Sequence, residues 1–325
     1  MAAVERPSRG TRRRRRLTLA ACVPLAAATA SALAARQVVV LHCRGAVLEH
    51  QPVARQRSPK FRPPLVGAGV SLSVRPEPVL KTLNNRGVEV GPFNRNNHAC
   101  TIIYLHGFAG NARQYMGRGL SLPWLFGVHH APCLRAVLPT AERRRQPWGQ
   151  QENTWYCYRN PTTNHVGNLT TLKVTRNLLK ELVTAEVARL GGEGHRVFLG
   201  GLSQGCAVAL DTYVRLAPKL HLGGFVGSVG FVPSDELGFL GASRCFKRLA
   251  ADEQQAQRPV WIQCAIDDDE EVPWKSLVLP SVRRAKQVMP GLQVREVSGR
   301  GHAIDEWEEE FLNEFVKAHA SFAYR

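Results

Sequence analysis

The cysteines of this 325-residue chain are not arranged as metal ligands. Eight cysteines are scattered along the sequence, with no Cys-x-x-Cys pair and no cluster of cysteine with histidine. Because zinc sites need several such ligands at short spacings, we expect neither a metal nor another cofactor. Cys100 and Cys264 lie within apolar runs, where a cysteine behaves as a small buried hydrophobe. A disulfide framework would require a secreted chain.

The sequence also lacks a nucleic-acid-binding motif and a basic stripe interleaved with aromatic residues, although its formal net charge is +17. Residues 1–60 carry 12 Lys and Arg against only Glu5 and Glu49, so more than half of the excess lies in this segment. A compact basic segment is more typical of targeting than of nucleic-acid recognition. We therefore expect no nucleic-acid partner.

The N-terminal segment, residues 1–35, joins a run of arginines to a stretch without charge. Arg12 to Arg16 precede an Ala-rich apolar run that contains the small-residue triplet Ala30-Ser31-Ala32. Three interpretations remain open: a cleaved secretory signal, an uncleaved signal anchor, or an Arg-rich organellar transit peptide. The run has only marginal length for a membrane span. A secretory or membrane-anchored location is favoured, with an organelle as the alternative.

The remaining sequence has no internal repeat and no second complete core. Residues 36–97 are basic and contain prolines, which predicts an irregular approach segment after one short strand at 38–41. Residues 98–325 form the predicted catalytic domain, in which apolar strands alternate with helical segments. The predicted strands are 101–105, 134–138, 197–199, 225–232, 260–265 and 292–297, and the helices are 170–190, a run from about 207, and 306–322. This order predicts an α/β fold with a mostly parallel central sheet and helices on both faces.

Ser203 is the candidate nucleophile. It lies in Gly201-Leu202-Ser203-Gln204-Gly205, directly after a predicted strand and before a predicted helix. This strand–turn–helix setting is what a nucleophile elbow requires, because the flanking glycines allow a tight turn that raises the hydroxyl above the sheet. The amino end of the following helix favours negative charge that develops at the reacting oxygen.

A serine nucleophile needs a histidine base, and three histidines follow Ser203 in the chain. His302 follows the last predicted strand and therefore lies on a loop at a carboxyl strand end. His221 precedes a strand and His319 lies within the closing helix, so both are expected to be surface or packing residues. His302 is the predicted base.

The acid that orients this histidine is predicted within the acidic run 267–271, which follows the strand 260–265. Asp269 is favoured because Asp269-Glu270-Glu271-Val272-Pro273 has an Asp-x-x-Val-Pro form. Asp267 is the second choice. The other carboxylates of the run are expected to be solvated.

The oxyanion hole requires two backbone N–H donors close to the serine. We expect one from Gln204, which follows the nucleophile, and one from Phe108, in the loop after the first predicted strand. Gly107 would permit the close approach of this loop. His106 is expected to orient the loop instead of acting as a base.

Together these motifs resemble the phospholipase/carboxylesterase family of α/β-hydrolases, which includes the acyl-protein thioesterases. The resemblance spans about residues 98–320 in the family's order. The matching segments are 103–108, 138–140, Trp155-Tyr156, 199–205, Gln263-Cys264, 269–273 and Gly301-His302. It implies metal-independent hydrolysis of esters or thioesters through an acyl-serine intermediate, with Ser203 attacking, His302 transferring the proton and Asp269 holding the imidazole.

The chain departs from the family's pattern at several positions. Ala265-Ile266 stands where His-Gly is common, Cys157 where an Asp often follows the aromatic pair, and Cys206 where Gly is frequent. These changes leave the triad intact but put the identity of the substrate in doubt. Trp148 and Trp155 are the candidate substrate-binding residues, although a solvated basic loop is the simpler interpretation of residues 143–148.

The predicted function is therefore a serine esterase or thioesterase that acts on an acylated small-molecule, lipid or protein substrate. The alternative is a hydrolase-fold binding or scaffolding protein without turnover, which the acidic run and the basic N-terminal segment suggest. An intact serine and histidine favour the enzyme.

Overall fold

The computed structural model describes residues 81–82, 87–90, 97–113, 131–299, 301–302 and 306–321. All of them belong to one compact unit, residues 71–325. The predicted targeting segment 1–35 and the predicted strand at 38–41 lie outside the described residues. Within the described part of the chain, no helix combines the length and the apolarity that a membrane span needs.

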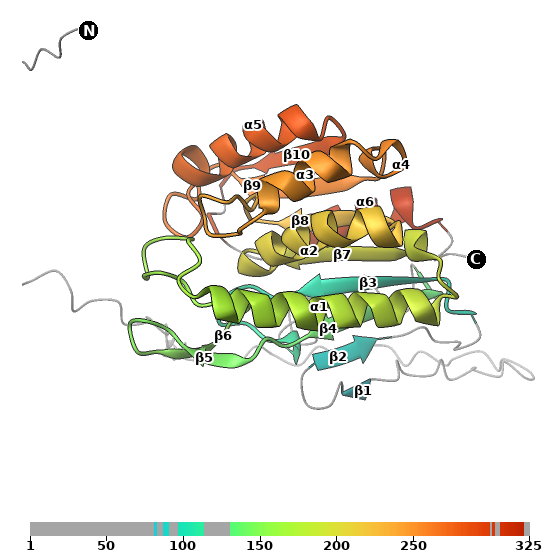
Figure 1. The fold of residues 1–325 in the computed structure, drawn as a ribbon, viewed down its shortest axis with the longest axis horizontal. Helices are drawn as coiled ribbons and strands as arrows, with labels where there is room; N and C mark the ends of the chain where they lie inside the picture. The colour runs from blue at the N-terminus through green and yellow to red at the C-terminus, as the bar shows by residue number, and fades with distance from the viewer. Residues whose placement is uncertain are drawn as a thin grey trace, which may run out of the picture. The chain divides into compact units, whose positions relative to one another are not determined.

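The structure is built on an eight-stranded sheet with the strand order β1-β2-β4-β3-β7-β8-β9-β10 (Figure 1). The strands from β4 to β10 in this order run parallel, and β2 pairs antiparallel with both β1 and β4. The strands of this sheet are β1 Lys81–Thr82, β2 Gly87–Val90, β3 Cys100–Leu105, β4 Leu134–Pro139, β7 Val197–Leu202, β8 Gly224–Ser228, β9 Val260–Ala265 and β10 Leu292–Val297. The predicted α/β-hydrolase architecture, a mostly parallel central sheet with helices, is confirmed.

The two faces of the sheet support two separate hydrophobic cores. On β3, Ile103 and Leu105 face one core, while Ile102 and Tyr104 face the other. This alternation follows from the two-residue period of a strand, and burial on both faces explains why the strand reads as one apolar run. Figure 1 shows α1, α2, α3 and α5 on the near face, with α6 behind the sheet.

Three helices lie where the sequence predicts them, at about 170–190, from 207 and at 306–322, whereas the helices between β8 and β10 were not predicted. Asn168 caps the first of the three, with its side-chain oxygen accepting hydrogen bonds from the N–H groups of Thr170 at 2.9 Å and Thr171 at 3.4 Å. The helices are α1 Leu169–Arg189, α2 Gln204–Leu220, α3 Ala242–Ala250, α4 Glu253–Ala256, α5 Leu279–Val288 and α6 Glu306–His319, with a π-helical turn at Trp274–Val278 and a 3-10 turn at Gly194–Arg196.

Two further regions differ from the prediction. The first is the segment predicted to be an irregular approach. It contains β1 and β2, two strands that precede residue 98 in the chain and extend the sheet at one edge. The second is an antiparallel hairpin of β5, Arg143–Arg145, and β6, Gln151–Asn153, where a solvated basic loop was predicted. Neither has the long apolar run that identifies a central strand.

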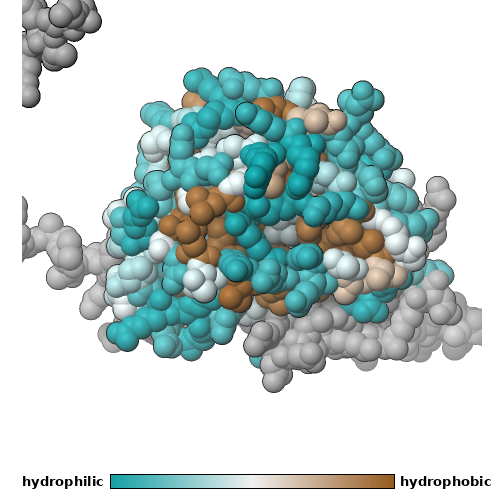
Figure 2. Space-filling view, in the orientation of Figure 1, coloured by the Kyte–Doolittle hydropathy of each residue, from teal (hydrophilic) through white to brown (hydrophobic). Residues whose placement is uncertain are grey.

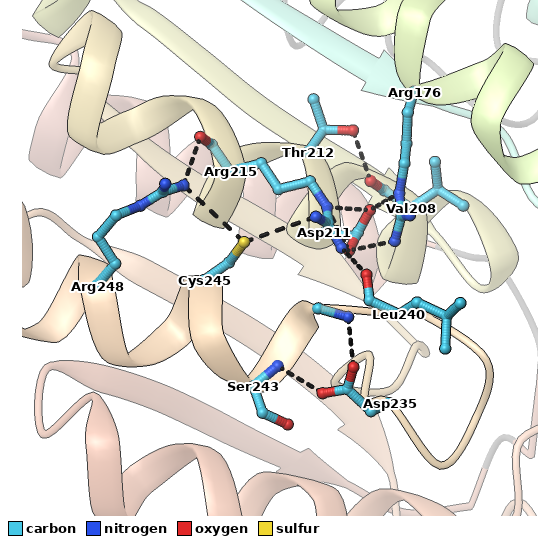
Figure 3. A network of polar contacts seen from close by, with 11 residues as sticks. Arg176, Val208, Asp211, Thr212, Arg215, Asp235, Leu240, Ser243, Cys245 and Arg248 are labelled. Carbon is cyan, nitrogen blue, oxygen red and sulfur yellow. Dashed lines mark hydrogen bonds and ion pairs between the residues drawn. The ribbon is translucent and has the colours of Figure 1, made fainter.

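An ionic network ties the helices of the near face together (Figure 3). Asp211 of α2 is completely buried and accepts hydrogen bonds from Arg176 of α1 at 2.7 and 3.0 Å and from Arg215 at 3.0 Å. Arg215 also donates to the carbonyl of Leu240, just before α3, at 2.8 Å. One carboxylate therefore connects α1, α2 and the loop that leads into α3.

Candidate active site

Ser203 occupies a strained turn between β7 and α2. Its φ is 52° and its ψ is −119°, which is unusual for a residue with a side chain. The turn is held by a hydrogen bond from the Ser203 N–H to the carbonyl of Ser228, 2.9 Å away. A Cβ at Gly205 would lie 2.4 Å from the carbonyl oxygen of His106, and one at Gly201 would lie 2.6 Å from the Gly205 backbone. Only glycine therefore fits on either side of this elbow.

The sheet brings three loops to the same edge as the serine. Leu105 pairs with Gly201, so the residues that follow β3 and β7 lie side by side. Val297 pairs with Ala265, so the loop containing His302 lies beside the acidic run. The carboxyl ends of neighbouring parallel strands thus assemble residues that are far apart in the sequence.

Ser203, His302 and Asp268 form a continuous hydrogen-bonded chain. His302 Nε2 lies 2.8 Å from Ser203 Oγ, and His302 Nδ1 lies 2.7 Å from Asp268 Oδ2. A carboxylate at Nδ1 fixes the proton on that nitrogen, which leaves Nε2 free to accept the serine proton. This is the arrangement of nucleophile, base and acid that acyl transfer requires.

The prediction that Asp269 contacts His302 is wrong, because Asp268 occupies that position. Asp268 is 4% exposed, and its carboxylate also accepts hydrogen bonds from the N–H groups of Glu271 at 3.0 Å and Val272 at 3.1 Å. Asp269 is exposed. Asp267, the second choice, instead accepts a hydrogen bond from the N–H of Gly299 at 2.7 Å.

The surroundings of Asp268 favour its ionised form. Burial alone would raise its pKa, but the hydrogen bond and charge of His302 and the N–H groups of Glu271 and Val272 outweigh burial and lower the pKa below its ordinary value. An ionised carboxylate is the form that accepts the Nδ1 proton and stabilises an imidazolium.

The loop after β3 lies directly against the serine. A Cβ at Gly107 would lie 3.4 Å from the Ser203 Cβ. Beyond it, Ala109 adopts a φ of 60° and donates its N–H to the carbonyl of Asn153 at 3.0 Å. Phe108, between these two residues, is therefore held in a fixed turn beside the nucleophile, where one of the two oxyanion donors was predicted.

Gln204, the other predicted donor, is the first residue of α2 and is fully buried. Its side-chain oxygen accepts hydrogen bonds from the N–H of Trp155 and the hydroxyl of Thr154, both at 2.9 Å. Its side-chain nitrogen donates to the carbonyl of Tyr156 at 3.0 Å. These three bonds fix Gln204, and with it the amino end of α2, against segment 154–156.

His106 orients the loop that follows β3, as predicted. It is 1% exposed, and burial lowers its pKa to about 4. His106 Nδ1 lies 2.6 Å from the carbonyl of Gly107, while Nε2 accepts the N–H of Ala141 at 2.9 Å. A neutral imidazole satisfies both contacts, because one nitrogen donates and the other accepts.

The two tryptophans predicted to bind substrate occupy different environments. Trp155 has no exposed surface, and its indole N–H donates to the carbonyl of His106 at 2.7 Å. The prediction that Trp155 contacts substrate is therefore wrong, since its side chain is buried beneath the loop that follows β3. Trp148 is partly exposed, and its ring lies 6.3 Å from the ring of Phe108, which in turn lies 5.2 Å from Tyr158.

A profile of the phospholipase/carboxylesterase family matches residues 92–320. The chain belongs to this family. Curated relatives include acyl-protein thioesterase 1 of Yarrowia lipolytica, 30% identical over 145 residues, which are 42% of this chain and 59% of that protein. Acyl-protein thioesterase 1 of Schizosaccharomyces pombe is 29% identical over 142 residues, which are 42% of this chain and 58% of that protein. The match thus spans less than two thirds of these relatives.

Solved structures show the same fold at low sequence identity. SOBER1 of Arabidopsis thaliana superposes with a TM-score of 0.52 and 19% identity, covering 68% of this chain and 99% of that one. A carboxylesterase of Mesorhizobium loti gives a TM-score of 0.52 at 13% identity, covering 73% of this chain and 98% of that one. At such low sequence identity, this structural likeness shows a shared fold alone.

One departure from the phospholipase/carboxylesterase pattern is accommodated in the core behind the serine. Cys206 is completely buried, and a Cβ at either Gly227 or Gly230 would lie 2.4 Å from its sulfur atom. The larger side chain at 206 therefore fits because residues 227 and 230 have none. Burial raises the pKa of the Cys206 thiol, which keeps it protonated.

Arg144 is a residue that the sequence interpretation missed. Instead of being solvated, its Nη1 donates to the carbonyls of Trp155 at 2.7 Å and Thr154 and Thr171 at 3.3 Å, and to the hydroxyl of Thr175 at 3.2 Å. The arginine anchors the hairpin to segment 154–156 and to α1. The signal was weak, because three consecutive arginines do not show which one points inward.

Proposed function

We propose that this chain hydrolyses carboxylic esters or thioesters of acyl groups through an acyl-serine intermediate. The observation that carries the proposal is the continuous chain from Ser203 Oγ to His302 at 2.8 Å and from His302 to Asp268 at 2.7 Å. Membership in a family of phospholipases and carboxylesterases supports the same class of reaction.

In the proposed mechanism, Ser203 Oγ attacks the acyl carbon while His302 Nε2 takes the hydroxyl proton. Asp268 stabilises the imidazolium that forms. The carbonyl oxygen becomes an oxyanion that the N–H groups of Phe108 and Gln204 would stabilise. Collapse expels the alcohol or thiol, which receives the proton from His302. The same histidine then activates water, which releases the acid and regenerates Ser203.

The proposed substrate is an acylated small molecule, lipid or protein. Support comes from two partly exposed aromatic residues, Phe108 in the loop after β3 and Trp148 near it, which provide apolar surface for an acyl chain. A series of p-nitrophenyl esters and acyl thioesters of increasing chain length would identify the preferred length and leaving group.

The test of the reaction uses a fluorophosphonate probe and p-nitrophenyl acyl esters on the purified protein. We expect the probe to label Ser203, and we expect Ser203→Ala to abolish labelling and to lower kcat by about a millionfold. Ser243→Ala provides a matched control, since Ser243 is exposed on α3. Folded protein that neither labels nor turns over these esters would contradict the proposal and favour a non-catalytic scaffold.

We also propose that residues 1–35 direct the chain to the secretory pathway or to a membrane, with an organelle as the alternative. The arginine run followed by an apolar stretch supports this proposal. A fusion of residues 1–60 to a fluorescent protein tests it. A diffuse cytosolic signal would contradict all three targeting interpretations.

A further inference from the structure

A cavity lies between α3 and α5, apart from the serine and its partners. Its volume is about 190 Å³, and its lining includes Lys247, Arg284, Phe246 and Val288. The loop after β8 forms another wall, fixed by a hydrogen bond from the N–H of Val232 to Ser281 Oγ at 3.2 Å. The cavity therefore has walls from three elements that are held together in the fold.

The two helices around the cavity are basic. Neither α3 nor α5 contains an acidic residue, and each exposes several arginines and lysines. One cation at the cavity comes from each helix, Lys247 from α3 and Arg284 from α5. In Figure 2, hydrophilic residues cover most of the upper part of the view, where Figure 1 labels these helices.

Two acidic side chains lie near the cavity, and neither neutralises it. Asp235 accepts hydrogen bonds from the N–H groups of Gly241 and Ser243 at the start of α3, as Figure 3 shows. Glu236 lies 3.8 Å from Arg284, but their side chains are 79% and 52% exposed. Such an exposed pair contributes little to stability, so Glu236 holds Arg284 only weakly.

The floor of the cavity is apolar, which narrows the class of ligand. Phe246, Val232 and Ala285 are all buried and provide hydrocarbon surface below the two cations. A hydrated inorganic ion gains nothing from such a floor, whereas an anion with an attached carbon segment does. The volume is below the 300–1,000 Å³ or so of a typical drug-sized site, so a headgroup with a few carbons fits and a whole lipid does not.

We propose that this cavity binds the phosphate group of an organic phosphate, with Lys247 and Arg284 contacting its oxygens and Phe246 and Val288 contacting the adjacent carbons. Arginine matches the geometry of phosphate oxygens, and lysine adds a compact charge from the opposite wall. The ligand is a soluble alkyl phosphate or the headgroup of a phospholipid, because both present this chemistry.

Calorimetric titration of the full chain with hexyl phosphate and with inorganic phosphate tests the proposal. We expect saturable binding of hexyl phosphate, at least tenfold tighter than that of inorganic phosphate, because only the former has an apolar part. The double variant Lys247→Gln/Arg284→Gln should weaken hexyl phosphate binding at least tenfold. The matched control Arg244→Gln/Arg283→Gln removes the same charge from the same helices outside the cavity and should change it less than twofold.

Absence of saturable binding, or an equal loss in both double variants, would overturn the proposal. A second arm measures binding to phosphatidylcholine vesicles with and without phosphatidic acid. Binding to the phosphatidic acid vesicles that depends on Lys247 and Arg284 identifies the lipid headgroup as the source, and binding of hexyl phosphate alone identifies a soluble ligand. Ser203→Ala should retain hexyl phosphate binding, and Lys247→Gln/Arg284→Gln should retain fluorophosphonate labelling. The binding proposal and the hydrolase proposal can therefore be contradicted independently of each other.

Discussion

Three consecutive aspartates, Asp267 to Asp269, lie in different environments. Asp267 accepts the N–H of Gly299, Asp268 contacts His302, and Asp269 is exposed. The turn that follows β9 decides between them, because it directs the N–H groups of residues 271 and 272 at Asp268. Those bonds and His302 favour the ionised carboxylate of Asp268.

Substitution of these neighbours separates their roles. We expect Asp268→Asn to lower kcat by about 10⁴-fold, because an amide does not hold the Nδ1 proton of His302 or stabilise the imidazolium. Asp269→Asn, on the exposed neighbour, should leave kcat within about twofold. Steady-state kinetics with a p-nitrophenyl ester measure both, and equal losses in the two variants would contradict the assignment of Asp268.

The sequence predicted Ser203 and His302 because each has a local signature, a glycine-flanked turn and a position after the last strand. It did not predict Asp268, since the spacing to Val272-Pro273 favours the next residue and only the folded turn shows which carboxylate is buried. The prediction for Trp155 was wrong for a related reason. An aromatic residue near a motif indicates importance, but not whether its ring faces a ligand or the core.

At the scale of elements, hydrophobic pattern predicted the central strands and long helices well, and the short polar strands poorly. β3 and β7 are buried at every position, which produces the apolar runs visible in the sequence. β2 and the β5–β6 hairpin are defined by pairing with neighbouring strands, so their residues carry little signal of their own. Arg144 belongs to such a hairpin, and its inward orientation was not predictable.

The hairpin offers a matched pair of arginines. Arg144→Gln should lower kcat/KM by about tenfold to a hundredfold, because segment 154–156 positions Gln204 and, through Trp155, the loop of His106. Arg145→Gln removes the same charge from an exposed neighbour and should stay close to wild type. Ester hydrolysis measured at a temperature where both variants are fully folded gives the comparison, and equal activity of the two would contradict the anchoring role.

Asp211 connects elements by charge instead of by hydrophobic packing. Asp211→Ala should lower the free energy of unfolding by about 3–5 kcal/mol, because it leaves Arg176 and Arg215 without their shared buried partner. Asn168→Ala removes the N-cap of α1 and should lower the free energy of unfolding by only about 1 kcal/mol. Urea unfolding of both variants measures the difference. A loss in Asp211→Ala no larger than that in Asn168→Ala would show that the network contributes little.

At the scale of the whole molecule, enclosing the sheet on both faces places an acid in the core. Glu308 of α6 is 4% exposed and forms a short hydrogen bond with the Tyr104 hydroxyl of β3. Its other carboxylate oxygen has no hydrogen-bond partner among the described residues. Burial raises the pKa of Glu308 to about 7, and the bond to Tyr104 offsets only part of this rise.

This raised pKa makes stability depend on pH in a defined window. Between the ordinary glutamate pKa of 4.5 and the folded value of about 7, the folded chain binds a proton that the unfolded chain releases. The contribution of protonated Glu308 is therefore complete below pH 4.5 and is lost as pH rises through about 7, a change of about 3 kcal/mol. Glu308→Gln retains an acceptor for Tyr104 but does not titrate. Urea unfolding between pH 4.5 and 8 should show wild-type stability declining relative to Glu308→Gln across this window, and parallel curves would contradict a neutral buried acid at this position.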